Sequence, residues 1–124
     1  MTSAPRVLAV DDHPVNLKLV RTLLVGEGFE VRTANNAEEA RAAIPGFAPQ
    51  VVLMDLQMPG MNGYELTRLL KADPATKDIV VLAMTAYAMK GDDALAAEAG
   101  CDGYITKPLD TRTLAKTILR YVGR

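Results

Sequence analysis

Residues 51–63 read VVLMDLQMPGMNG, and this stretch says most about the fold. Its first four residues, Val51–Met54, are apolar without alternation, which predicts a strand covered on both faces, as in a parallel sheet. The strand ends at Asp55, and the residues from Met58 to Gly63 are rich in the Pro, Gly and Asn of turns. The stretch therefore predicts a buried strand that ends in a carboxylate and a loop.

A helix is predicted directly after this loop, from Tyr64 to Lys71, with Leu66, Leu69 and Leu70 available for packing. The same succession of a short apolar run and a longer helical pattern recurs on both sides of it. Strands are expected at residues 7–10, 30–33, 51–54, 79–83 and 103–106, and helices at 14–25, 36–44, 64–71, within 89–99 and from about 110 onward.

This alternation predicts an α/β fold in which a five-stranded parallel sheet carries helices on both faces. The second strand is half polar, because Val31 and Thr33 alternate with Glu30 and Arg32, so an edge position suits it. An edge position for this strand favours the order 2-1-3-4-5 of doubly wound, flavodoxin-like sheets. We expect a single domain over residues 1–124.

Local signals predict several helix ends. Gly26 and Gly28 can end the first helix. Asn36, followed three residues later by Glu39, predicts a capped start with a returning acidic side chain. The pair Pro45-Gly46 is expected to break the second helix at about Ile44.

The composition limits the function classes. The chain has 124 residues, 49% of them hydrophobic, and a net charge of −1, so no basic field exists for direct nucleic-acid binding. No apolar run approaches the roughly 20 residues that cross a bilayer, and the N-terminus lacks a signal-peptide pattern. A cytoplasmic protein without membrane insertion is therefore expected. Cys101 is the only cysteine and is expected to pack as a core thiol.

Polar side chains follow the ends of four predicted strands. Asp11 and Asp12 follow the first strand, Asp55 the third, Thr85 the fourth and Lys107 the fifth. Each has an ordinary explanation by itself, as a helix cap, a turn residue, a strand-end hydroxyl or a loop lysine. In the predicted strand order they converge on one edge of the sheet, where such folds bind ligands. This convergence favours a functional site over four unrelated explanations.

The charges of these groups indicate a metal and a phosphoryl group. Three carboxylates and one ammonium sum to −2, which a divalent cation neutralises. Mg²⁺ suits the site because it takes oxygen ligands and bridges to phosphoryl oxygens. Lys107 and Thr85 can then bind two further phosphoryl oxygens, and Asp55 is the expected nucleophile. His13 adjoins the acidic pair, but a solvated helix-start residue is favoured over a ligand, since Mg²⁺ prefers oxygen.

The motifs resemble those of a known family. Asp11-Asp12, Asp55 within LMDLQMPGMNG, Thr85-Ala86 and the run Tyr104 to Pro108, YITKP, resemble the receiver domains of bacterial two-component response regulators, which have a CheY-like fold. The resemblance covers essentially the whole chain. Residues 85–92, TAYAMKGD, look like those of DivK-type stand-alone receivers and of receivers fused to hybrid histidine kinases.

The resemblance implies a role for each motif residue in the metal site. Asp55 is the phosphoacceptor, and Asp12 and Asp55 ligate Mg²⁺ together with the backbone carbonyl of Gln57. Asp11 holds a metal-bound water. Gln57 and Tyr87 lie near the path of the hydrolytic water and tune dephosphorylation.

It also implies how the phosphoryl group is held and sensed. Thr85 and Lys107 contact the phosphoryl group, and Tyr104 turns inward as Thr85 moves. The bond between Lys107 and Pro108 is a cis peptide in the family.

The function expected is a switch that catalyses only its own phosphorylation and dephosphorylation. A histidine kinase or a histidine phosphotransferase supplies the phosphoryl group, and an unknown protein target reads the face made by the helix within 89–99, the fifth strand and the last helix. A second interpretation is a pseudo-receiver that never turns over phosphate. Such proteins usually lack a site residue, whereas this sequence has all of them. A haloacid-dehalogenase-like phosphatase is a third, but it needs Asp-x-Asp where this chain has adjacent Asp11-Asp12.

Overall fold

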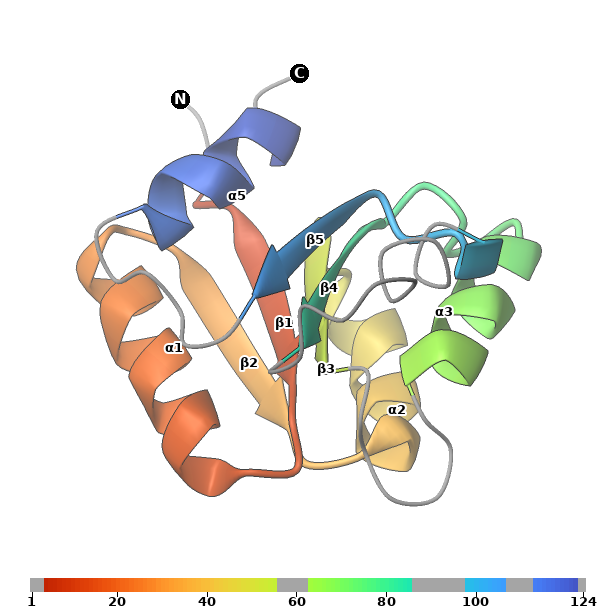
Figure 1. The fold of residues 1–124 in the computed structure, drawn as a ribbon, viewed down its shortest axis with the longest axis horizontal. Helices are drawn as coiled ribbons and strands as arrows, with labels where there is room; N and C mark the ends of the chain where they lie inside the picture. The colour runs from red at the N-terminus through yellow and green to blue at the C-terminus, as the bar shows by residue number, and fades with distance from the viewer. Residues whose placement is uncertain (1–3, 56–62, 86–97, 107–112, 123–124) are drawn as a thin grey trace.

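The computed structural model describes residues 4–55, 63–85, 98–106 and 113–122 (Figure 1). Its centre is a parallel five-stranded sheet in the order β2-β1-β3-β4-β5, which confirms the predicted topology. The strands are β1 (Arg6–Val10), β2 (Glu30–Ala34), β3 (Val51–Asp55), β4 (Val80–Thr85) and β5 (Gly103–Thr106). The strand order reverses between β1 and β3, so the carboxyl ends of these two strands border the expected binding edge.

Helices cover both faces of the sheet (Figure 1). They are α1 (Pro14–Gly26), α2 (Ala37–Phe47), α3 (Gly63–Ala72) and α5 (Leu114–Val122). The predicted helix within 89–99 falls mainly on residues outside the described ranges, and so does the predicted start of the last helix near residue 110. Among the described helices none is long and apolar enough to span a bilayer.

Alternate residues of each central strand face opposite helix layers, because successive strand side chains point to opposite faces. Along β1, Val7 and Ala9 pack in the cluster of α1 and α5, whereas Leu8 and Val10 pack in the cluster of α2 and α3. All four are fully buried. Burying one valine or leucine side chain contributes about 1.5–3 kcal/mol, so the two clusters hold the strand ends firmly in place.

The first helix ends as its glycines predict. Gly28 adopts a left-handed φ of 91°, its N–H donates to the carbonyl of Val25, and the N–H of Phe29 donates to that of Leu24. This pair of bonds is a Schellman motif, in which glycine avoids the steric cost of a left-handed residue. Leu24 and Phe29 are both buried, so the turn also completes the core.

The second helix begins as predicted but ends later than predicted. Asn36 caps it, accepting a bond of 2.8 Å from the Glu39 N–H, and the Glu39 carboxylate returns to accept a bond from the N–H of Asn35. The expected break at Pro45 is wrong, because α2 continues to Phe47. Pro45 removes one backbone hydrogen bond in the last turn, and burial of Phe47 against the sheet offsets this loss.

In α3, Leu66 and Leu70 are buried as expected, but Leu69 is 44% exposed and does not belong to the core. It lines a surface groove with Arg41 and Pro45 of α2 instead. Cys101 is half buried and packs against both Ala83 and the cluster of α2 and α3, which agrees with the predicted core thiol.

Candidate functional site

Two predicted acidic residues lie at the carboxyl ends of adjacent central strands. Val10 of β1 is in register with Met54 of β3, so Asp11 and Asp55 follow in line. Asp11 continues the pairing toward β2, because its N–H donates to the carbonyl of Ala34 over 3.1 Å. Both carboxylates are nearly inaccessible, with 1% of Asp11 and 2% of Asp55 exposed. The two apolar strands thus place two buried acidic side chains at the same edge of the sheet.

Asp12 completes the group. Asp11, Asp12, Asp55 and His13 each place a possible ligand atom within 4.8 Å of the others. The structure therefore brings together three of the predicted site residues, from two separate segments of the chain. It also adds His13, which the sequence placed in solvent.

The Asp11 carboxylate is oriented by the first turn of α1. Its Oδ1 accepts a bond of 2.9 Å from the His13 N–H, and its Oδ2 accepts one of 3.3 Å from the Asn16 side-chain amide. The ordinary explanation of Asp11, a carboxylate that accepts hydrogen bonds at the start of a helix, is therefore partly true. Asn16 was not predicted; its only signal in the sequence is a polar residue in the first turn after the acidic pair.

Asp12 has an oxygen without a hydrogen-bond donor. Its Oδ1 is buried and has no hydrogen bond to the residues described, although the side chain as a whole is 27% exposed. The imidazole Nδ1 of His13 lies 3.0 Å away, at ion-pair distance, but the pair lacks hydrogen-bond geometry. Leaving a buried carboxylate oxygen without a donor is costly, so a cation would be stabilised here. Three carboxylates grouped this closely fit a hard, oxygen-preferring ion such as Mg²⁺.

His13 itself is largely solvated, as predicted, with 67% of its side chain exposed. Its Nδ1 nevertheless lies 3.2 Å from Asp11 Oδ1 and 3.0 Å from Asp12 Oδ1. The sequence could suggest this only by adjacency, because the contact depends on how the ring turns at the start of α1.

The remaining predicted residues lie on or beyond β4 and β5. The backbone of Thr85 ends β4 and is in register with Thr106, one residue beyond the pair Asp55 and Met84. Tyr104 is half buried and packs against Ala83, its register partner. The side chain of Thr85, and all of Gln57, Tyr87, Lys107 and Pro108, lie outside the described residues, so their predicted roles and the cis peptide stay predictions.

Known proteins resemble this chain along nearly its whole length. A model of the response regulator receiver domain matches residues 7–119. The polar-differentiation response regulator DivK of Brucella anthropi is 38% identical over 117 residues, which are 94% of this chain and 95% of that protein. The sensor protein GacS of Pseudomonas syringae pv. syringae is 42% identical over 123 residues, but these are 97% of this chain and only 14% of GacS.

The similarity extends to the fold of solved structures. The chemotaxis protein CheY4 of Vibrio cholerae superposes with a TM-score of 0.90 at 29% identity, covering 96% of this chain and 99% of that one. Fold, acidic group and sequence matches thus lead to one conclusion, which the motifs had predicted: the chain belongs to the response regulator receiver domain family of two-component systems.

Proposed function

We propose that this domain is a phosphorylation-controlled switch in which Asp55 accepts the phosphoryl group. The observation that supports the proposal best is the grouping of Asp11, Asp12 and Asp55 within 4.8 Å at the carboxyl edge of the sheet. Asp55 ends β3, which lies between β1 and β4, so its backbone belongs to the centre of the sheet. A nucleophile needs such fixed placement, because most of the catalysis in phosphoryl transfer is positioning and charge stabilisation.

The proposed metal is Mg²⁺, with Asp12, Asp55 and the carbonyl of Gln57 as direct ligands and Asp11 one water away. The hydrogen bonds of Asp11 and Asp12 support this division. Both oxygens of Asp11 already accept bonds, from His13 and Asn16, whereas Asp12 keeps a buried oxygen that accepts none from the described part of the chain. When bound, the ion offsets two of the three carboxylate charges and polarises a phosphoryl oxygen.

In the transfer step, a carboxylate oxygen of Asp55 attacks the phosphorus atom of a phosphohistidine on the partner. The new O–P bond forms as the P–N bond breaks, and the electron pair of that bond leaves with the imidazole. We propose that the Lys107 ammonium and the Thr85 hydroxyl bind two phosphoryl oxygens. Water later cleaves the aspartyl phosphate, with Gln57 and Tyr87 tuning the rate, so the domain catalyses only its own phosphorylation and dephosphorylation.

The proposed phosphoryl donor is a histidine kinase or a histidine phosphotransferase. The similarity to both DivK, a response regulator, and GacS, a sensor protein, supports a place in a phosphorelay. We propose that the face of β5, α5 and the predicted helix within 89–99 passes the state on to a protein target. Tyr104 lies on β5 and is its proposed switch residue.

Phosphoryl uptake tests the proposal. The protein is incubated with phosphoramidate, with MgCl₂ or with EDTA, and its intact mass is followed over time. One phosphoryl group should be gained in MgCl₂ and almost none in EDTA. Asp78→Asn is the matched control, because it neutralises an exposed aspartate just before β4, at the other end of the strands. Wild-type protein that gains no phosphoryl group in MgCl₂ would refute the proposed function.

A further inference from the structure

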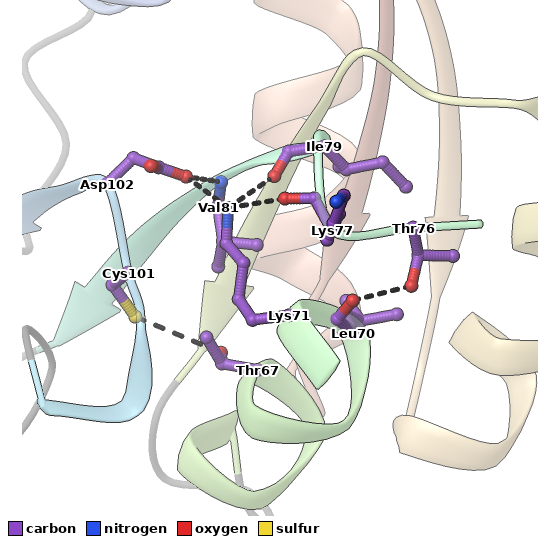
Figure 2. A network of polar contacts seen from close by, with 9 residues as sticks. All are labelled: Thr67, Leu70, Lys71, Thr76, Lys77, Ile79, Val81, Cys101 and Asp102. Carbon is purple, nitrogen blue, oxygen red and sulfur yellow. Dashed lines mark hydrogen bonds and ion pairs between the residues drawn. The ribbon is translucent and has the colours of Figure 1, made fainter. Parts of the chain in front are cut away.

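A polar network joins three elements (Figure 2). It lies where β4 and β5 begin, which is the end of the parallel sheet opposite the carboxylates. Lys71, in the last turn of α3, directs its ammonium to the carbonyls of Lys77 and Ile79, 3.3 and 2.8 Å away, and to Asp102 Oδ2, 2.8 Å away. Lys77 and Ile79 precede β4, and Asp102 directly precedes β5. One ammonium therefore ties α3 to the starts of two strands.

Asp102 also pairs with the backbone of β4. Its Oδ2 accepts a bond of 2.9 Å from the Val81 N–H, and its own N–H donates to the Val81 carbonyl over 2.7 Å. Leu82 and Gly103 are the next partners in the register, so Asp102 extends the ladder by one residue before β5 begins. Because Val81 is fully buried, this pairing anchors β5 to the interior of the sheet.

β5 needs such an anchor more than the central strands do. It is a four-residue strand at the edge of the sheet. Gly103, Tyr104 and Ile105 are only half buried, so burial alone specifies its position weakly. Gly103 adds a second constraint, since a Cβ there would lie 2.8 Å from Leu82 Cδ2 and would overlap the Tyr121 hydroxyl of α5.

We propose that Lys71 and Asp102 are a positioning pair for phosphoryl transfer. By fixing the start of β5, they hold Tyr104 and the strand end from which Lys107 follows directly in the chain. The inference rests on the proposed function, because it assumes that Lys107 binds the phosphoryl group and that Tyr104 is the switch residue. Neither Lys71 nor Asp102 belongs to the carboxylate group, so neither is a catalytic residue.

Removing the anchor should slow transfer without weakening the metal site. In Asp102→Ala, phosphoryl uptake from phosphoramidate at saturating MgCl₂ should slow about tenfold, since small misplacements of a positioning group are costly. The carboxylates follow β1 or end β3, so the Mg²⁺ affinity should stay within about twofold of wild type, as for distant sites that act independently. A variant that was merely less well folded would lose both together.

The experiment compares wild type, Asp102→Ala and Lys71→Met, with Asp78→Ala as the matched control. Lys71→Met keeps a side-chain stem beside Gly100, where an added Cβ would lie 2.9 Å from Lys71 Cγ, and removes only the ammonium. Uptake is followed by intact mass and Mg²⁺ affinity by isothermal titration calorimetry, below the unfolding transition of every variant. If Asp102→Ala does not fold, Asp102→Asn replaces it, because it keeps an oxygen for Val81 but loses the charge.

The two variants should act through one contact, so the double variant should be no slower than Asp102→Ala alone, and Asp78→Ala should match wild type. Wild-type uptake in both single variants would overturn the inference and leave the proposed function intact. So would a Mg²⁺ affinity that falls in parallel with the rate. If wild type itself takes up no phosphoryl group, the proposed function and this inference fail together.

Discussion

Asp12 is the residue on which the proposed metal site depends most, because its Oδ1 is buried without a hydrogen bond from the described residues. Asp12→Ala should weaken Mg²⁺ binding about tenfold or more, since it removes a ligand and a charge together. Isothermal titration calorimetry measures this, with Asp78→Ala as the control. Repeating the wild-type titration at lower pH should show weaker binding, because protons compete with the metal. Unchanged affinity in Asp12→Ala would remove this residue from the site.

Cys101 offers a test of burial. Desolvation raises the pKa of the Cys101 thiol above its usual value and Asp102 adds to this, while the bond to Thr67 and the Lys71 ammonium oppose it. Iodoacetamide should therefore alkylate the folded protein more slowly than the urea-unfolded protein at mildly alkaline pH, as mass spectrometry can follow. The same shift lowers stability only as pH rises from the ordinary thiol pKa through the raised one. Equal alkylation rates would contradict the burial.

The acidic residues were predictable one by one because they depend only on where strands end. Asp11 and Asp55 are placed by the backbone, and a strand-end assignment is enough to bring them together. The contacts of His13 and Asn16 were not predictable, since they depend on side-chain rotamers in one helical turn.

At the scale of elements, two glycines at the end of α1 should respond differently to the same change. Gly28→Ala should destabilise the protein by about 1 kcal/mol, because alanine is strained at a φ of 91°. Gly26→Ala should be neutral or stabilise by up to about 1 kcal/mol, because a Cβ there meets nothing within 4 Å and alanine favours helix. Urea unfolding of both variants measures the difference. Equal destabilisation would contradict the Schellman ending.

Helix ends were harder to predict than strands, for local reasons. Proline usually ends a helix, but α2 continues past Pro45 to Phe47, because Phe47 packs in the core. Leu69 has the same chemistry as Leu66 and Leu70, yet only the latter two lie on the face that meets the sheet. Both errors come from tertiary packing, which propensity does not contain.

The topology of the whole molecule was predictable because the residue pattern of each strand indicates whether the strand lies inside the sheet or at its edge. Continuous apolar runs in β1 and β3 placed these strands inside, and the polar alternation of β2 placed it at an edge. The ion pair between Lys71 and Asp102 was not predicted. It joins residues 31 apart in the sequence, and neither residue type is unusual enough to indicate such a contact.

The proposed switch is a property of the whole molecule. If Thr85 couples the phosphoryl group to Tyr104, Thr85→Ala should bind a phosphoryl mimic but lose the distant response. The packing of Tyr104 on Ala83, two residues before Thr85 in β4, supports this route. NMR spectra of wild type with and without beryllofluoride should show shifts reaching β5, and those shifts should shrink in Thr85→Ala. Undiminished shifts at β5 in the variant would mean that another element carries the signal.

The central claim is that the phosphoryl group resides on Asp55, and borohydride trapping tests it most directly. Protein phosphorylated with phosphoramidate and Mg²⁺ is treated with borohydride, which reduces an aspartyl phosphate to homoserine, and is then digested and sequenced by mass spectrometry. Homoserine should appear at position 55 in wild type, and Asp55→Asn should give neither uptake nor reduction product. Homoserine at another aspartate, or full uptake by Asp55→Asn, would contradict the account.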